Sequence, residues 1–531
     1  MKIKKYLLIS SLIVSSLLVF VSCEKQLDVK PSSELESNYF SSENRIQRSV
    51  GAAYAAITDM YSPHLGGGGT PALLPILAAD DITFDGSWSS HETFSGLNAS
   101  DGRVGELWNK LYILVSRCNF VLAKIEEPDV KMIYTTEGLK NANRGEALFL
   151  RSWAFYKLWD LYRKAPIQDE RIIAIENTIL SPSAGFEMLD NAIASLEEAA
   201  TLLPDSWDSK NLGRVTKNSA YGLLVKANVL HACYNSGNAG DYAKAIAAFE
   251  KISGSAQLVA TFGDNFDYRT ENNSESLFEF QASHAPAQDN AWLDNNFGGD
   301  VGQMGAFYHM WDGHWGNYAV GVYGPTQKLV NAFEPGDPRM DETLSNNADN
   351  LGWSLWWISP QWDKFGGYQM VKYTHGDRGN SYDNTWSLSS KNNPRLLRLA
   401  DVKLAAAEAY LQTGNSAAAR NQVNDIRSRA RNSVTPASIV PADLATVSMN
   451  EIMNERFIEL AGEDGHRWTD LRRWHAAGII NLATWTATDF GFPYNASDFA
   501  FQVPKNLLYP IPTSELDKNP EMSASGNNPG Y

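Results

Sequence analysis

Residues 146–162 read EALFLRSWAFYKLWDLY, and their apolar side chains recur at the spacing of an α-helix. One face is formed by Ala147, Leu150, Ala154, Leu158 and Leu161, and aromatic side chains occupy most of the other faces. A helix that is apolar nearly all round is normally buried in a protein core. The segment therefore predicts a core helix whose aromatic rings serve packing, with ligand contact as the alternative.

A helical hairpin is predicted closer to the C-terminus. Asn393 and Pro394 supply an N-cap and a first-turn proline for a helix over residues 395–413, which a glycine then ends. Ser416 can cap a second helix over residues 417–430. The short, glycine-containing connection predicts that the two helices pack against each other.

The same helix–turn–helix pattern occurs over residues 216–246, where glycines interrupt two helical segments. Both hairpins resemble tetratricopeptide-like repeats, in which Ala residues lie at the close helix contacts. The repeats are too few and too widely spaced for a pure solenoid. We therefore expect a mostly α-helical scaffold with large irregular insertions.

Composition narrows the class of protein further. The 531 residues are 44% apolar and 20% charged, which is typical of a globular chain rather than a disordered one. The formal charge of −16 argues against a nucleic-acid partner, which would normally meet a basic face. The three Cys are too few for a disulfide scaffold, and their spacing does not suit a zinc site.

The largest insertion is distinct in composition. Residues 292–386 hold eight of the 16 Trp, interleaved with Gly, Asn, Asp and Ser and without helical periodicity. A second, smaller loop region runs from Tyr61 to Asp101. Trp and Tyr can stack on the apolar faces of sugar rings, whereas Asp, Asn, Arg and His satisfy the hydroxyls. The loops therefore predict carbohydrate binding, with sealing of the loops onto the scaffold as the alternative role for any single Trp.

Motifs for catalysis are missing from the sequence. The chain has no phosphate-binding loop, no H-E-x-x-H zinc motif and no G-x-S-x-G nucleophile elbow. Acids alternate with arginines in a C-terminal cluster of Glu455, Glu459, Glu463, Arg467, Asp470, Arg472 and Arg473. A glycosidase needs two carboxylates that face each other across about 5–10 Å. The alternation favours structural ion pairs instead.

No cofactor is expected. His309, Asp312 and His314 could hold a metal in principle, but hydrogen-bonding roles are favoured for three such residues in a Trp-rich loop. A structural calcium ion in the acidic loops is an open alternative, although no coordination loop of the usual form is visible.

The N-terminus predicts export and a lipid anchor. Three Lys within residues 1–5 precede an apolar run over residues 6–21, which is short for a membrane span but suits a signal peptide. Ser22-Cys23 resembles a bacterial lipobox, in which the Cys is acylated and becomes the mature N-terminus. We therefore expect a lipoprotein signal peptide over residues 1–22 and lipidation at Cys23, with a plain cleaved signal as the alternative.

Short motifs occur in a fixed order along nearly the whole mature chain. They include Leu27-Asp28, Ala79-Asp80-Asp81, Trp108-Asn109-Lys110-Leu111-Tyr112, Gly213-Arg214-Val215-Thr216-Lys217, Asp337-Pro338-Arg339, Arg398-Leu399-Ala400-Asp401, Asn454-Glu455-Arg456, Tyr509-Pro510-Ile511-Pro512 and Asn528-Pro529-Gly530-Tyr531. In number, order and spacing this set resembles SusD/RagB-family outer-membrane nutrient-binding lipoproteins of the Bacteroidetes type.

The resemblance implies a SusD-like, mostly α fold in which four tetratricopeptide-like helix pairs support a loop-rich ligand face. A SusD-like N-terminal helical region would cover residues 23–234. A SusD/RagB-like C-terminal region would cover residues 235–531 and include the Trp-rich loops over 292–386. In this interpretation the arginine and glutamate clusters belong to the scaffold.

The resemblance also implies a role. Such proteins lie at the cell surface, anchored in the outer membrane, on a SusC-like TonB-dependent transporter. They capture oligosaccharides and pass them inward without chemical change. A secreted glycoside hydrolase and a repeat-type scaffold that binds only protein are the alternatives.

Ligand contacts in the family often come from two loops, which here surround residues 81–91 and 292–323. The expected stacking residues are Trp88, Trp292, Trp311, Trp315 and Tyr323, and the expected hydroxyl partners are Asp81, His91, Asp312 and His314. Trp353, Trp356 and Trp357 are second-tier candidates. Starch-like, xylan-like and host glycans are all compatible with these residue types.

Overall fold

The computed structural model describes residues 36–61, 71–84, 89–282, 323–346, 367–373, 392–492 and 496–531. Over these ranges the chain is mostly α-helical, and its strands form three two-stranded antiparallel ladders. The predicted fold class is therefore confirmed. Among the described helices, none is both long enough and apolar enough to cross a membrane.

The helices are α2 (Glu36–Tyr39), α3 (Glu43–Ala55), α4 (Thr58–Tyr61), α5 (Leu73–Leu77), α6 (Ser89–Glu92), α7 (Gly102–Lys124), α8 (Pro128–Lys131), α9 (Leu139–Tyr162), α10 (Glu187–Leu202), α11 (Lys217–Tyr234), α12 (Ala239–Phe249), α14 (Gln327–Ala332), α15 (Arg339–Thr343), α16 (Leu399–Gln412), α17 (Ser416–Asn432), α18 (Met449–Glu459), α19 (His466–Ala476), α20 (Ala487–Phe490), α21 (Thr513–Lys518) and α22 (Pro520–Ser525). The strands are β1 (Ile82–Phe84), β2 (Ser276–Glu279), β3 (Tyr323–Pro325), β4 (Leu344–Ser345), β5 (Gln369–Met370) and β6 (Arg395–Arg398). β1 pairs with β3, β2 with β6, and β4 with β5.

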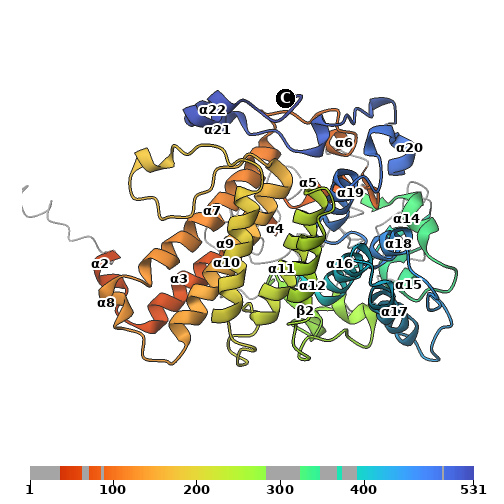
Figure 1. The fold of residues 1–531 in the computed structure, drawn as a ribbon, viewed down its shortest axis with the longest axis horizontal. Helices are drawn as coiled ribbons and strands as arrows, with labels where there is room; N and C mark the ends of the chain where they lie inside the picture. Colours follow the sequence, from red (N-terminus) through yellow and green to blue (C-terminus); the bar gives the residue numbers. More distant parts are fainter. Residues whose placement is uncertain are drawn as a thin grey trace, which may run out of the picture.

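The longer helices pack as successive pairs. α3 packs against α7, α9 against α10, α11 against α12, and α16 against α17. Contacts of α7 with α9, α10 with α11, and α12 with α16 join the pairs into one stack. Figure 1 shows these helices following one another from left to right, with α21 and α22 along the upper edge. The hairpins predicted over residues 216–246 and 395–430 are both part of this stack.

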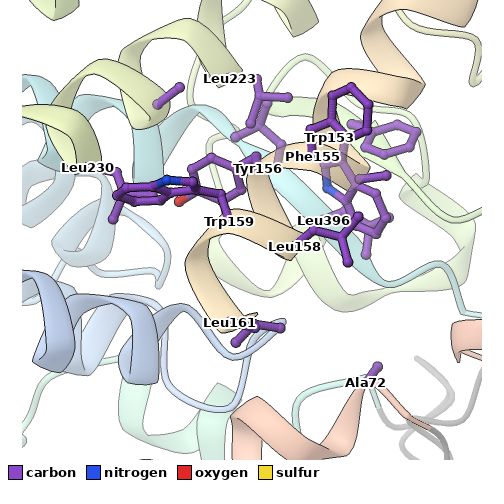
Figure 2. Packing of buried hydrophobic residues seen from close by; sticks show 14 of the residues in the cluster. Ala72, Trp153, Phe155, Tyr156, Leu158, Trp159, Leu161, Leu223, Leu230 and Leu396 are labelled. Carbon is purple, nitrogen blue, oxygen red and sulfur yellow. The ribbon is translucent and has the colours of Figure 1, made fainter. Parts of the chain in front are cut away.

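α9 is the predicted core helix. Figure 2 shows Trp153, Phe155, Tyr156, Leu158 and Trp159 of α9 close to Leu223 and Leu230 of α11. The Trp159 ring stacks on Phe186 at 5.6 Å and meets Tyr234 edge-on at 5.3 Å between ring centroids. All five of these α9 side chains are buried, so the packing interpretation of the aromatic residues is confirmed.

The start of α16 differs from the sequence prediction. Residues 395–398 form strand β6, which pairs antiparallel with β2, and the helix begins only at Leu399. Both arginines of this strand are buried, and an extended backbone lets each of them reach acids on other elements. Arg395 Nε lies 3.2 Å from Glu279 Oε1, for example. These buried ion pairs override the local helix signal of Asn393 and Pro394.

The cap of α17 also differs by one residue. Asn415, and not Ser416, is the N-cap, and its side-chain oxygen accepts a hydrogen bond of 3.1 Å from the Ala418 backbone N–H. Asn and Ser are both good N-caps, and the preceding turn decides which of them adopts the non-helical conformation that capping requires.

A buried ion-pair network crosses the C-terminal half. Arg398 bonds to Glu275, Glu459 and Glu463 at 2.7–2.8 Å, and both Arg339 and Arg429 also reach Glu459. The remaining pairs are Arg456 with Asp401 and Asp470, Arg467 with Asp80, Arg472 with Asp160, and Arg473 with Glu408 and Asp470. The structural interpretation of the acid–arginine cluster is therefore confirmed. Burial alone would raise the pKa of Glu459, but the charges of Arg429, Arg398 and Arg339 hold it well below its ordinary value.

Replacement of Arg398 tests the weight of this network. We expect Arg398→Met to lower the free energy of unfolding by about 3–5 kcal/mol, because it leaves buried carboxylates without their shared cation. Arg269, which pairs with Asp267 on the surface, provides the matched control. Arg269→Met should change the free energy of unfolding by less than about 1 kcal/mol. Urea unfolding followed by circular dichroism measures both. Equal effects of the two substitutions would show that the network contributes no more than a surface pair.

Candidate functional site

Nine of the 16 Trp lie in four segments outside the described residues: 85–88, 283–322, 347–366 and 374–391. The other seven belong to the described part of the chain, where Trp108, Trp153, Trp159, Trp468 and Trp474 are buried and Trp207 and Trp485 are half-buried. The seven described Trp residues thus belong to the scaffold. For the four segments that hold the other nine, the structure shows where each segment attaches.

The ends of the four segments are linked to one another. Phe84 is the Cα partner of Tyr323 in the β1–β3 ladder, and Ser345 is the partner of Gln369 in the β4–β5 ladder. β3 also contacts β5. We call this set of attachment points the loop base, and it comprises Phe84, Ala282, Tyr323, Ser345, Gln369, Tyr373 and Asn393.

The loop base continues from these ladders to β6. The Ala282 backbone N–H donates to Asn393 Oδ1 at 2.7 Å. The Arg395 backbone N–H donates to the Tyr373 hydroxyl at 3.2 Å. All four Trp-containing segments therefore begin and end on one connected part of the structure, although they are far apart in sequence.

Asp80 clamps the loop base to the helical scaffold. Its carboxylate is fully buried and bonds to Arg467 Nε and to Lys328 Nζ, each at 2.6 Å. Its backbone carbonyl accepts a bond of 2.7 Å from the Thr326 hydroxyl, directly after β3. Burial would raise the pKa of Asp80, but the Arg467 and Lys328 charges lower it, so the carboxylate stays ionised. One acid thus joins β1, β3, α14 and α19.

Asp81 lies beside Asp80, but within the described part of the chain only one of its two carboxylate oxygens is hydrogen-bonded. Its Oδ2 accepts a hydrogen bond of 2.8 Å from the Gly462 backbone N–H, whereas its buried Oδ1 has no partner among the described residues. Burial, with a further contribution from the Asp80 charge, raises the pKa of Asp81 to about 6. Gly462 has φ +70°, and a Cβ there would lie 2.9 Å from the Met370 side chain of β5. The positive φ favours glycine at this turn, which contacts the Met370 side chain at the loop base.

α6 is fixed on the other side of segment 85–88. Glu92 accepts from the Thr83 hydroxyl at 2.5 Å and from the Phe84 N–H at 3.0 Å. His91 Nε2 lies 2.7 Å from Asp101 Oδ2, and Asp101 in turn caps the N-terminus of α7. The two ends of the segment that carries Trp88 are therefore held together by side chains of the scaffold.

Asp464 makes another contact between distant segments, which was not predicted from the sequence. Asp464 accepts a hydrogen bond from the Tyr61 hydroxyl and pairs with Lys157 Nζ at 2.8 Å. The Tyr61 ring stacks on Phe280 at 6.2 Å, so the chain just before residues 62–70 lies beside the chain just before residues 283–322. Asp464 has φ +40°, a left-handed conformation that is costly for a residue with a Cβ. In the sequence, only the Asp464-Gly465 pair indicates a turn here, because the partners of Asp464 are hundreds of residues away.

The predicted ligand residues divide into two groups. Trp88, Trp292, Trp311, Asp312, His314 and Trp315 lie outside the described residues, as do Cys23, His309 and the second-tier Trp residues. Asp81 and His91 are buried and bonded within the protein, and Tyr323 is placed only by its backbone pairing with Phe84. The structure thus brings Asp81, His91 and Tyr323 to the loop base, while their ligand roles stay predictions.

The buried acids at the loop base are bonded within the protein. The buried acids there are held in ion pairs with Arg and Lys or bonded to backbone and side-chain donors. Within the described ranges, no group of three or more His, Cys, Asp and Glu could hold a metal ion. What this arrangement does provide is a rigid support for aromatic-rich segments.

Comparison with known proteins gives consistent matches along the chain. A family model described as the SusD family matches residues 358–531, and one described as "Starch-binding associating with outer membrane" matches residues 25–228. SusD-like protein P25 of Formosa agariphila is 23% identical, over 98% of this chain and 99% of its own length.

Solved structures show the same fold. A SusD homologue from Bacteroides thetaiotaomicron superposes with a TM-score of 0.74 at 20% identity, covering 94% of this chain and 99% of its own. A laminarin-binding SusD-like protein superposes with a TM-score of 0.69 at 22% identity, covering 92% of this chain and 100% of its own.

The raised pKa of Asp81 makes a prediction about pH. The folded state binds a proton at Asp81 more tightly than the unfolded chain does, so the contribution of Asp81 to stability should fall as pH rises from about 4 to about 6. Asp81→Asn removes this titration, and its stability relative to wild type should rise over that range by up to about 3 kcal/mol. Urea unfolding at several pH values measures the difference.

Asp208→Asn is the matched control. Asp208 is exposed, and a hydrogen bond from Asn211 lowers its pKa, so the wild type should gain rather than lose stability relative to this variant as pH rises. A pH-independent difference between wild type and Asp81→Asn would contradict the predicted titration of Asp81.

Proposed function

Because the chain belongs to the SusD family, we propose that it is a cell-surface protein that captures oligosaccharides on the segments carried by the loop base. One observation supports this most directly. The segments that hold nine of the 16 Trp all attach to one connected support, and Trp rings are suited to stacking on sugar faces. A shared support would let several rings contact one glycan chain.

Two further points support a proposal for the class of ligand. One family model is named for starch binding, and one similar structure is described as laminarin-binding. Starch and laminarin are both glucose polymers with different linkages, and stacking on a ring face is tolerant of linkage. We therefore propose a neutral glycan as the ligand, bound without a cofactor.

The proposed role ends with delivery rather than with chemistry. A lipid anchor at Cys23 would hold the protein on the outer membrane, where it would pass the bound glycan to a SusC-like TonB-dependent transporter. Three acids at the loop base support binding without cleavage, because Asp80 and Glu463 are held in ion pairs and Glu92 in hydrogen bonds within the protein.

Calorimetry of the chain over residues 24–531 tests this proposal. Malto-oligosaccharides, laminarin oligosaccharides, xylo-oligosaccharides and host glycans are titrated separately, and each mixture is then analysed for products. We expect saturable binding of at least one class, the sugar recovered intact, and the same affinity after chelation with EDTA. Cleavage products would instead support a glycoside hydrolase, and binding of no sugar would favour a scaffold that binds only protein.

Substitution of loop Trp residues tests where the sugar binds. Trp311→Ala combined with Trp315→Ala should weaken binding by about tenfold or more, because two stacking contacts are lost. Trp207→Ala is the matched control, since Trp207 lies outside the four segments and packs 4.0 Å from the Arg214 guanidinium. Equal losses in both variants would contradict the proposed location.

A further inference from the structure

The connection between α9 and α10 exposes an apolar tip. Ile173 is 80% exposed, Ile175 is 79% exposed and Ile179 is 47% exposed. Residues 175–178 form a short 3-10 helix, and the Thr178 hydroxyl donates to the Ile175 carbonyl at 2.6 Å. Three large apolar side chains on one short projection differ from single exposed residues, which are common and need no explanation. We call residues 173–179 the isoleucine tip.

The roots of this projection are firmly fixed. On its N-terminal side, Tyr112, Asn119 and Arg151 donate to the carbonyls of Pro166, Gln168 and Asp169, each at 2.7 Å. On its C-terminal side, the Asn519 side chain donates to the Leu180 carbonyl at 2.9 Å. The tip is therefore held away from the core by bonds at both roots, and its exposure is a property of the fold.

The isoleucine tip lies next to the point where the chain leads back to Cys23. Arg171 donates two hydrogen bonds of 2.8 Å to the Glu36 carboxylate, and Lys124 Nζ lies 2.5 Å from the same group. These two cations lower the pKa of Glu36 to about 2, so this carboxylate stays ionised at any physiological pH. Cys23 precedes Glu36 by 13 residues, which span at most about 45 Å. A lipid on Cys23 would therefore keep this end of the protein close to the membrane.

We propose that the isoleucine tip inserts into the surface of the bilayer that holds Cys23 and forms a second membrane contact beside the lipid. The proposal rests on the lipid anchor of the proposed function. A convex apolar projection fits a fluid medium that closes around it, whereas a protein partner would need a matching cavity. Binding of a surface element to a bilayer scales with the apolar area that it buries, so the three isoleucines would add to the membrane affinity that the acyl anchor provides.

The charges around the tip define the depth and the lipid dependence of insertion. Glu176 lies on the tip itself and is exposed, and Glu170 precedes Arg171 at its root. These carboxylates stay at the level of the headgroups, so insertion is shallow. Anionic lipids would repel them, and the tip therefore inserts into zwitterionic bilayers at least as well as into anionic ones.

A fluorescent probe on the tip tests this directly. Cys118 and Cys233 are buried, so Ile175→Cys in the chain over residues 24–531 can be labelled selectively with an environment-sensitive dye. A histidine tag before residue 24 tethers the protein to phosphatidylcholine vesicles that contain a nickel-chelating lipid, in place of the acyl anchor. We expect a blue shift of the dye and quenching by doxyl-labelled lipid, both no stronger when phosphatidylglycerol is added.

Ile439→Cys is the matched control. Ile439 is 87% exposed and follows α17, which lies at the opposite end of the helix row from α2 in Figure 1. Its dye should show neither the shift nor the quenching. Equal signals at residues 175 and 439, or no response at residue 175, would overturn the proposal and leave a protein partner as the occupant of the tip.

A triple variant separates this proposal from the proposed function. Ile173→Ser, Ile175→Ser and Ile179→Ser together should reduce retention on tethering vesicles by about tenfold, because the apolar contact is lost. Glycan affinity measured by calorimetry should stay unchanged. Unchanged retention would contradict membrane insertion even if the variant binds glycans normally. If the protein binds no glycan at all, the proposed function fails, but the vesicle measurement still tests membrane insertion.

Discussion

Arg398 is fully buried, and its guanidinium bonds to glutamates from separate parts of the chain. Glu275 precedes β2, Glu459 ends α18, and Glu463 lies in the turn before α19. A buried arginine without these partners would be far too costly. The guanidinium of Arg398 therefore joins the β2–β6 ladder, α18 and the turn before α19.

This constraint extends to the loop base. Glu463 also pairs with Lys372, which lies between the segments 347–366 and 374–391. Gly462, the residue before Glu463, donates its backbone N–H to Asp81. Arg467, four residues after Glu463, bonds to Asp80. The turn that receives Arg398 thus also fixes two of the sites at which the Trp-containing segments attach, so the scaffold and the candidate binding face share one set of ion pairs.

The two ends of the molecule then have different tasks. The loop base carries the aromatic residues proposed to meet a glycan, and the isoleucine tip lies beside the chain that leads to the proposed lipid anchor. Both are held by hydrogen bonds from scaffold side chains to backbone groups, as with Thr326 at Asp80 and Asn119 at Gln168. Fixed presentation of this kind reduces the entropy that binding would otherwise cost.

The sequence by itself determined the helical scaffold, because apolar periodicity and helix-ending glycines are local signals that tertiary contacts only reinforce. It also predicted the core role of α9 and the ion-paired state of the acid–arginine cluster. Most of the partners in those ion pairs, such as Asp80 for Arg467 and Asp160 for Arg472, are distant in sequence and were set by the tertiary structure. The tertiary structure alone decided that residues 395–398 form a strand, because the acids that attract Arg395 and Arg398 are distant in sequence. It likewise decided that Asp81 and His91 are bonded within the protein and that Tyr61 meets Asp464. Burial and long-range partners set the chemistry of these side chains, and neither can be read from neighbouring residues.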